Sequence, residues 1–409
     1  NQDRTITTTK TQEIMETMYM HRVGTEQRVL MPDEIRDINN RRIGVNPDSL
    51  APKLLRQAVM NQMKKDNMTP VLSCPQGMTG VEKTANVQFV EYPTEPNLEQ
   101  RPVKRLPFIE ANTKEVSVGH LKNDCIIPVF SKDNEVTISH HGFMETVYDA
   151  VNEVFRCERV DRPDVRVSHI IKGRIPEAIN KPVNQLLESD KTIYYERMMF
   201  CMEIPTIHED IAGNRLNLTI GGVRAYNNEN LYSRKTYEKF KLFIGFKNMV
   251  CCNMCVSTDG YKSEVRVMCI AELYRAAIEL FRSYSIDSHL DQMKRLQDYY
   301  ITEAQFAQFL GKSRMYQFLP NKEKKMLPEM LMTDTQINLV TKAYYNDEDF
   351  GRSNDSKELQ MWKMYNLLTG ANKSSYIDSF LDRSLNAGEL STGICKALVG
   401  DNEYSWFIR

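Results

Sequence analysis

The residues best suited to bind a charged ligand lie between Arg224 and Lys247. This segment holds two acidic residues, Glu229 and Glu238, and aromatic side chains recur along it. Its six basic residues are Arg224, Arg234, Lys235, Lys239, Lys241 and Lys247. Single-stranded nucleic acid is held by cations that follow its phosphates and by aromatic rings that stack on its bases, at about 1–3 kcal/mol per base. The segment therefore predicts a face that binds unpaired DNA or RNA.

Strand periodicity places part of this set on one side of a β-strand. Lys239, Lys241 and Lys247 have the same parity, so they would face solvent while the apolar residues between them face the core. Those apolar residues are Phe240, Leu242, Ile244 and Phe246. The predicted binding set is completed by Arg224, Arg234, Lys235 and Tyr237. A second interpretation stays open, because lysines on a half-buried strand also prevent edge-to-edge pairing of sheets without binding a ligand.

Three cysteines, Cys251, Cys252 and Cys255, form the densest sulfur cluster, and Cys269 follows. Cys252 and Cys255 have the two-residue gap of zinc knuckles. The gap lies in the apolar segment 249–256, which is interpreted as a strand, where positions three apart face opposite sides. No second Cys or His pair follows at the usual distance, so we expect buried thiols and no metal.

The acidic and histidine residues give weaker signals for catalysis. His208, Glu209 and Asp210 are consecutive and could hold a cation or a proton. A metal site needs three or four converging ligands, and the sequence supplies one local group, so a solvated loop is favoured. An enzyme would need a site assembled from distant residues such as His208, Glu209 and Asp347. No catalytic motif occurs in a usable setting, so we predict no catalytic residue and no cofactor.

Composition limits the classes of protein that fit. The chain has 409 residues, of which 41% are hydrophobic and 26% charged, values typical of a globular protein. Its 53 basic and 54 acidic residues give a net charge of -1, which excludes the overall basic charge of a dedicated duplex binder. No segment approaches eighteen apolar residues, and the first residues contain no hydrophobic core of a signal peptide. With nine cysteines mostly in apolar stretches, we expect a reducing, cytoplasmic location and no membrane partner.

The first quarter of the chain is predicted to be an N-terminal helical arm, residues 1–91. Helical patterns cover residues 32–43 and 48–65, and the Gly-Val-Asn-Pro turn between them resembles a helix-turn-helix. An ordinary helical hairpin is the favoured interpretation, because this spacing is common. Residues 92–107 contain four prolines and are interpreted as a linker.

The remainder is predicted to be one α+β domain, with a β-rich half at 108–269 and a helical half at 270–409. Strands are expected at 124–130, 135–138, 165–171, 196–204, 215–223, 239–247, 249–256 and 263–269, with one helix that Ser139 caps. Short connections between them imply an antiparallel sheet. In the helical half, Thr302 with Gln305 and Thr333 with Gln336 predict capping boxes. Gly311 and Gly388 are interpreted as helix ends, and residues 404–408 are expected to pack on the core.

Two segments carry a resemblance to a known family: Phe-Ile-Glu-Ala-Asn-Thr at 108–113 and Asp-Cys-Ile-Ile-Pro-Val-Phe-Ser-Lys-Asp-Asn-Glu at 124–135. They resemble the start of domain-of-unknown-function family 3871 of Bacteroidetes, and the segments 217–222, 246–253 and 362–370 match it further. These segments also resemble phage and plasmid proteins of domain-of-unknown-function family 932, with their Val-Cys-x-Asn and Leu-Thr-Gly-like segments. The resemblance covers about residues 108–409. It implies a mobile-element or prophage setting and supplies no catalytic residues.

Three functions follow as hypotheses. The first is non-enzymatic binding of single-stranded DNA or RNA in replication or recombination of a mobile element, through the segment 224–247. The second is an interaction or regulatory protein that acts through its helical half, with self-association into a homo-oligomer as one form of it. The third is an enzyme with a site assembled from distant residues.

Overall fold

A computed structural model gives the fold, and the residues that it describes lie mainly after position 106. They are residues 20–23, 26–29, 107–125, 137–178, 180–226, 237–353 and 356–409. The chain divides into two compact units, Asn1–Arg105 and Leu106–Arg409. In the first unit, β1 (Met20–Val23) and β2 (Glu26–Val29) pair as an antiparallel hairpin, which the sequence does not predict. The helices expected at 32–43 and 48–65 and the linker up to residue 106 lie outside the described residues, so they stay predictions.

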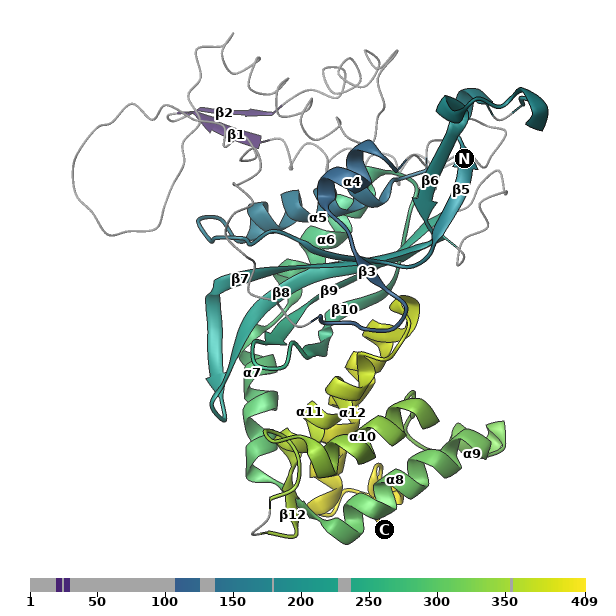
Figure 1. Ribbon diagram of the computed structural model, residues 1–409. Coiled ribbons are helices and arrows are strands. Elements are labelled where there is room, and N and C mark those ends of the chain that lie inside the picture. Colours follow the sequence, from purple (N-terminus) through teal and green to yellow (C-terminus); the bar gives the residue numbers. More distant parts are fainter. Residues whose placement is uncertain are drawn as a thin grey trace, which may run out of the picture. The chain divides into compact units, whose positions relative to one another are not determined.

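A six-stranded antiparallel sheet organises the second unit (Figure 1). The strands lie in the order β10-β9-β8-β7-β4-β3, so most neighbours in the chain are neighbours in the sheet. Their bounds are β3 Lys114–Glu115, β4 Asp164–Val167, β7 Arg197–Ile211, β8 Asn214–Ala225, β9 Glu238–Asn248 and β10 Met254–Val267. The long β7–β8 hairpin is the one that the sequence predicts, and its turn uses Ala212 and Gly213 at positive φ. The expected α+β class with an antiparallel sheet is confirmed.

A second, smaller antiparallel pair projects from this sheet (Figure 1). It consists of β5 (Ile170–Arg174) and β6 (Lys191–Tyr195). Between them lie three short 3-10 turns, η1 (Pro176–Ala178), η2 (Val183–Gln185) and η3 (Glu188–Asp190). The strand expected at 165–171 is therefore divided between β4 and β5. Of the strands expected at 124–130 and 135–138, residues 126–136 lie outside the described chain.

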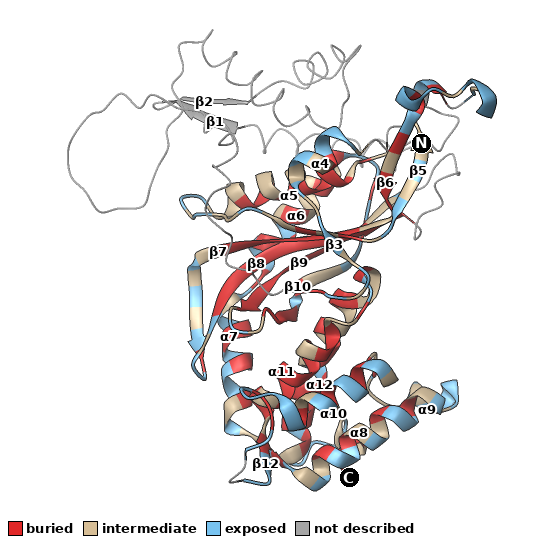
Figure 2. Cartoon of the chain, viewed as in Figure 1, coloured by how far each residue is buried: buried red, intermediate tan, exposed pale blue. Residues whose placement is uncertain are grey.

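Helices cover both faces of the large sheet (Figures 1 and 2). On one face lie α5 (His140–Val154), with α4 (Val118–Asn123) beside it, and α6 (Ile270–Ser283). Ser139 caps α5 as predicted, by accepting a hydrogen bond from the backbone N–H of Gly142 at 2.9 Å. On the other face lies α12 (Ile377–Leu398), which contacts β7, β8 and β10. Because both faces are covered, β8 is buried from Leu216 to Ala225 rather than alternating between core and solvent.

The helical half packs around α11 (Met361–Asn372) and α12. The other helices are α7 (Ile286–Arg295), α8 (Glu303–Phe318), α9 (Asn321–Lys324) and α10 (Asp334–Asn346), with the 3-10 turns η5 (Leu296–Asp298) and η6 (Ser405–Phe407). A short antiparallel pair, β11 (Tyr300–Thr302) and β12 (Glu358–Gln360), precedes α8 and α11. Phe407 and Ile408 are buried, so the expected packing of the last residues on the core is confirmed.

The sequence predicts the starts of these helices more accurately than their ends. Both predicted capping boxes are present, at the N-termini of α8 and α10. The predicted ends at Gly311 and Gly388 are wrong, since α8 continues to Phe318 and α12 to Leu398. Glycine inside a helix costs about 1 kcal/mol relative to alanine, and burial of later residues such as Tyr316 and Ile394 outweighs that cost. Among the described residues, no helix has the length and apolar character needed to cross a membrane.

Candidate functional site

Two of the predicted binding residues, Arg224 and Lys247, are buried. The Arg224 guanidinium donates hydrogen bonds to Glu238 and to the backbone oxygen of Ile138, and it lies 4.4 Å from the ring centroids of both Tyr226 and Phe240. Its side chain has no exposed surface. A phosphate cannot reach this guanidinium, so the prediction that Arg224 contacts nucleic acid is corrected. Arg224 instead anchors the segment before α5 to the sheet.

Lys247 near the end of β9 forms a buried ion pair with Glu203 of β7. The amide of Asn217 donates a second hydrogen bond to Glu203, at 3.1 Å. Burial by itself disfavours the charged ammonium, but the neighbouring Cys201 and Glu203 raise the pKa of Lys247 above its usual value. Lys247 thus stays charged inside the protein and is inaccessible to a polymer, which is the second correction to the predicted set.

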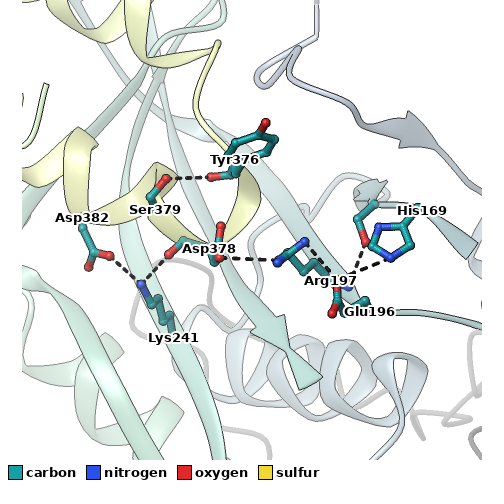
Figure 3. Close-up of polar contacts among 9 residues, drawn as sticks. His169, Glu196, Arg197, Lys241, Tyr376, Asp378, Ser379 and Asp382 are labelled. Atoms are coloured by element: carbon teal, nitrogen blue, oxygen red, sulfur yellow. Dashed lines mark hydrogen bonds and ion pairs between the residues drawn. The ribbon is translucent and has the colours of Figure 1, made fainter. Parts of the chain in front are cut away.

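Lys241 contacts the first turns of α12 instead of solvent (Figure 3). Its ammonium lies 2.5 Å from Asp382 Oδ2 and 2.6 Å from the backbone oxygen of Asp378. The Tyr261 hydroxyl donates to the other oxygen of Asp382 at 2.6 Å. Arg197 lies 3.5 Å from the Asp378 carboxylate and continues the network to Glu196 and so to His169. Lys241 therefore fixes α12 to the sheet.

Lys239 and Tyr237, at the start of β9, remain the accessible part of the described set. The Lys239 ammonium lies 3.1 Å from Glu264 of β10, and its side chain is 39% exposed. Tyr237 is 53% exposed. Arg234 and Lys235 lie outside the described residues. The predicted inward face of β9 is confirmed, because Phe240, Leu242, Ile244 and Phe246 all belong to the main core. The opposite face was expected to be open, and this expectation is wrong, since α12 packs there against Phe243.

The cysteine cluster lies at the turn between β9 and β10. Residues 249–253 form this turn, and Cys252 has a φ of 57°, so the strand expected at 249–256 begins only at Met254. Burial raises the pKa of the Cys251 thiol to about 11 and that of Cys255 to about 12, which keeps both protonated at neutral pH. Within the described part of the chain, no three His, Cys, Asp or Glu side chains are grouped as metal ligands.

The three residues named for a distributed catalytic site are not brought together by a shared contact. His208 Nδ1 lies 3.0 Å from the backbone oxygen of Pro205, Glu209 pairs with Lys294 at 3.2 Å, and Asp347 accepts bonds from its own loop. Each of them has a separate local role. These contacts give no support to an enzyme that uses this set.

A buried asparagine cluster joins two of the segments that carry the family resemblance. Asn253 at the β9–β10 turn donates to the backbone oxygen of Asn366 on α11 at 3.0 Å, and Asn248 donates to the Asn366 side chain at 3.3 Å. Lys373 at the end of α11 donates to the backbone oxygen of Cys251. The segments at 246–253 and 362–370 therefore meet in space as a polar contact between the sheet and the helical half.

Comparison with protein families places the chain. The family model described as "Domain of unknown function, B. Theta Gene description (DUF3871)" matches residues 94–408. The chain belongs to the DUF3871 family. It has no significant match among curated proteins or among solved structures.

The DUF3871 domain exposes apolar side chains at the end of α8 and after α9. Met315 and Phe318 lie one turn apart on α8 and are 57% and 82% exposed, and Met326 is 81% exposed. Lys322 on α9 and Lys325 directly after it are exposed as well. We call these five residues the α8–α9 surface. Neither lysine forms an ion pair with a described residue, and none of the five stands out in the sequence alone.

A cavity of about 450 Å³ lies elsewhere in the DUF3871 domain, where β10, α7, α11 and α12 meet. His289 and Arg295 line it from α7, and Glu389 and Lys396 line it from α12. His289 is buried, whereas the three charged residues are exposed. From the sequence, only the helical spacing of these residues within α7 and within α12 could be predicted. The cavity itself could not, because about 80 residues separate the two helices in the chain.

Proposed function

We propose that this DUF3871 protein is a protein-binding module whose α8–α9 surface docks an acidic, amphipathic segment of a partner protein. The observation that carries the proposal is the exposure of Phe318 and Met326, at 82% and 81%, in a segment that also exposes Lys322 and Lys325, neither of which pairs with a carboxylate among the described residues. Single exposed apolar residues are ordinary, but several together with flanking charges are typical of interaction sites.

The chemistry of the surface selects the partner. From Lys312 to Met326 the chain carries five basic residues and a single acidic one, Glu323, so an acidic partner is complementary in charge. Two of the three exposed apolar side chains are methionines, whose flexible thioethers adapt to the apolar face of a bound helix. The cations of β9 are, by contrast, held in ion pairs within the protein.

The test is titration of the full chain with a fluorescent peptide that forms an acidic amphipathic helix. A scrambled peptide with the same composition but no apolar face is the matched ligand control. We expect the first to bind with a Kd of about 10 μM or tighter and the second at least tenfold more weakly. Phe318→Ser and the pair Lys322→Glu with Lys325→Glu should each weaken binding about tenfold or more.

Met268→Ser serves as the control variant, because Met268 is also exposed, at 59%, but lies between β10 and α6. It should bind as the unmodified chain does. Absence of peptide binding, or unchanged binding by Phe318→Ser, contradicts the proposal. Sedimentation and anionic vesicles test other occupants: self-association or vesicle binding that Phe318→Ser abolishes would assign the surface to a second copy or to a membrane instead.

Single-stranded nucleic-acid binding is the second candidate, favoured by one observation. Tyr237 and Lys239 are accessible at the start of β9, directly after the segment that contains Arg234 and Lys235. An aromatic ring beside cations is the combination that holds unpaired bases and phosphates. A role in replication or recombination of a mobile element, which the resemblance implies, belongs to this candidate.

Lys241 is unsuitable for testing this candidate, because Lys241→Glu would place a carboxylate against Asp382 and disturb the fold. The informative variant is Arg234→Glu with Lys239→Glu, compared with Lys357→Glu at an exposed control position. Binding of a labelled oligonucleotide should weaken steeply with salt and weaken further in the double variant alone. Binding that is independent of salt, or equal in both variants, contradicts nucleic-acid binding through this segment.

A further inference from the structure

The cavity between α7 and α12 has two walls with different chemistry. On α7, His289, Gln292 and Arg295 recur every three residues, so they share a helix face and line one side. These three side chains are all potential hydrogen-bond donors. On the other side lie Glu389 of α12 and Glu403 of the turn that follows it, with Lys396 further along α12. The α7 side thus carries donors and one positive charge, and the α12 side carries two carboxylates and one ammonium.

His289 is the buried residue of the α7 wall, and its ring is uncharged. The Tyr284 hydroxyl lies 2.6 Å from Nδ1 of His289, and no other hydrogen-bond partner of that hydroxyl occurs among the described residues. A buried hydroxyl must donate its proton to be satisfied, so Nδ1 accepts and the proton of the neutral ring is on Nε2. Burial lowers the pKa of His289 to about 4, so the ring is neutral at pH 7.

The charged side chains around the cavity are not held in ion pairs with other described residues. Among the described residues, Arg295, Lys396, Glu389 and Glu403 form no ion pair with one another or with other side chains. The cations of β9 differ in this respect, since each is matched by a carboxylate. The carboxyl group of Glu389 is partly shielded from water although the residue as a whole is exposed, and this desolvation raises its pKa. A cationic group placed beside it would favour its charged form. The cavity therefore offers charges of both signs to a ligand.

We propose that this cavity binds a small zwitterion, such as a free α-amino acid, with its carboxylate toward Arg295 and His289 and its ammonium toward Glu389 and Glu403. A volume of about 450 Å³ leaves room for an amino acid together with its side chain. Charge-assisted hydrogen bonds at both ends give the ligand one orientation. The inference is independent of the α8–α9 surface, whose five residues do not line the cavity.

The test measures the thermal unfolding midpoint and the calorimetric affinity of the full chain with each of the proteinogenic amino acids. Acetate and methylamine, which each carry one of the two charges, are the ligand controls. We expect at least one amino acid to bind with a Kd of about 1 mM or tighter and to raise the midpoint, and neither single-charge control to do so. Binding of acetate alone would overturn the zwitterion in favour of a simple anion site.

Variants at four exposed positions distinguish binding in the cavity from nonspecific effects of charge. Arg295→Gln and Glu389→Gln should each weaken binding about tenfold, because each removes one charge-assisted contact. Arg282→Gln and Glu348→Gln make the same chemical changes outside the cavity and should leave the affinity unchanged. Circular dichroism of each variant confirms folding. No amino-acid binding, or equal affinity in all four variants, overturns the proposal.

Discussion

At the scale of single residues, the buried ion pair between Lys247 and Glu203 shows why a lysine occurs on an apolar strand. Both side chains are almost fully inaccessible, and Asn217 donates a further hydrogen bond to Glu203. A buried pair of this kind adds little net stability compared with an apolar pair, but loss of one partner leaves a charge without compensation. The pair therefore fixes how β7, β8 and β9 are aligned. The protein loses stability when one partner of the pair is removed.

We expect Lys247→Met to lower the free energy of unfolding by about 3–5 kcal/mol, because Glu203 would remain buried without its cation. Adding Glu203→Gln should restore most of the loss, since the amide oxygen of glutamine still accepts the bond from Asn217. Urea unfolding at neutral pH measures both variants. A single variant as stable as the unmodified chain would show that the pair is solvated.

His140 should make the protein less stable in mild acid. Its Nε2 donates to the backbone oxygen of Tyr195 at 2.8 Å, and burial, followed by the charge of Arg224, lowers its pKa to about 3. The unfolded chain binds a proton near pH 6.5 and the folded chain does not, so stability falls as pH decreases below 6.5, by up to about 1.4 kcal/mol per pH unit.

The measurement is a series of urea midpoints between pH 7 and pH 5. His140→Gln keeps a side-chain donor for Tyr195 but cannot titrate, so its curve should be flatter than that of the unmodified chain. His208→Gln makes the same substitution at an exposed position on β7 and is the matched control. Parallel curves for all three proteins would contradict a neutral buried His140. His289, which is also buried and neutral, adds a slope of the same sign.

Residue types alone could predict which side of β9 each lysine faces, but not what covers that side. The acidic partner of Lys247 is 44 residues away in the chain, and that of Lys241 is 141 residues away. Local sequence contains no signal for such pairs. A lysine that pairs with the start of α12 and a lysine that faces solvent therefore occur in the same local sequence pattern. The parity of Phe240 and Phe246 was predicted correctly because it depends only on the strand's own geometry.

At the scale of elements, close approach of α5 to the sheet depends on a glycine in β8. A Cβ atom at Gly222 would lie 2.5 Å from the Phe143 ring of α5 and 2.6 Å from the backbone oxygen of Lys241. Neither neighbour can move without separating α5 from β8 or β8 from β9. The helix and the strand thus meet at a position where no other residue fits.

We expect Gly222→Ala to destabilise the protein by about 1–3 kcal/mol through this overpacking. Gly311→Ala is the matched control, because Gly311 is exposed inside α8 and a Cβ atom added there would have no neighbour within 4 Å, so this change should stabilise by about 1 kcal/mol. Thermal or urea unfolding of both variants gives the two signs. Equal effects of the two substitutions would contradict the packing described for α5.

The starts of helices could be predicted from the sequence, but their ends could not. Capping boxes at Thr302 and Thr333 predicted helix starts correctly, because a cap is a local contact between residues three apart. The interpretation of Gly311 and Gly388 as ends was wrong, because helix continuation depends on burial contributed by other elements. Pairing of β7 with β8 was predicted from a short turn, whereas cover by α12, far along the chain, was not.

At the scale of the whole molecule, residues Leu106–Arg409 form one compact unit. Its main core is continuous from Phe143 on α5 through Phe246 on β9 to Trp362 on α11. The β-rich and helical halves therefore share their buried surface, and neither half encloses a core alone. The family match, which begins at residue 94, covers this unit almost entirely.

We therefore expect a chain that begins at Leu106 to fold with the urea midpoint of the full-length protein, while a chain that ends at Cys269 fails to fold. The first keeps all the contacts of its unit. The second exposes the sheet residues that Leu273 of α6 and Phe380 of α12 cover, because both helices are removed. Far-ultraviolet circular dichroism and tryptophan fluorescence should report one coincident transition for the longer fragment, since Trp362 and Trp406 lie in the helical half and most strands in the other. Two separate transitions would mean that the halves are independent domains, and the shared core would then not be what holds the α7–α12 cavity in place.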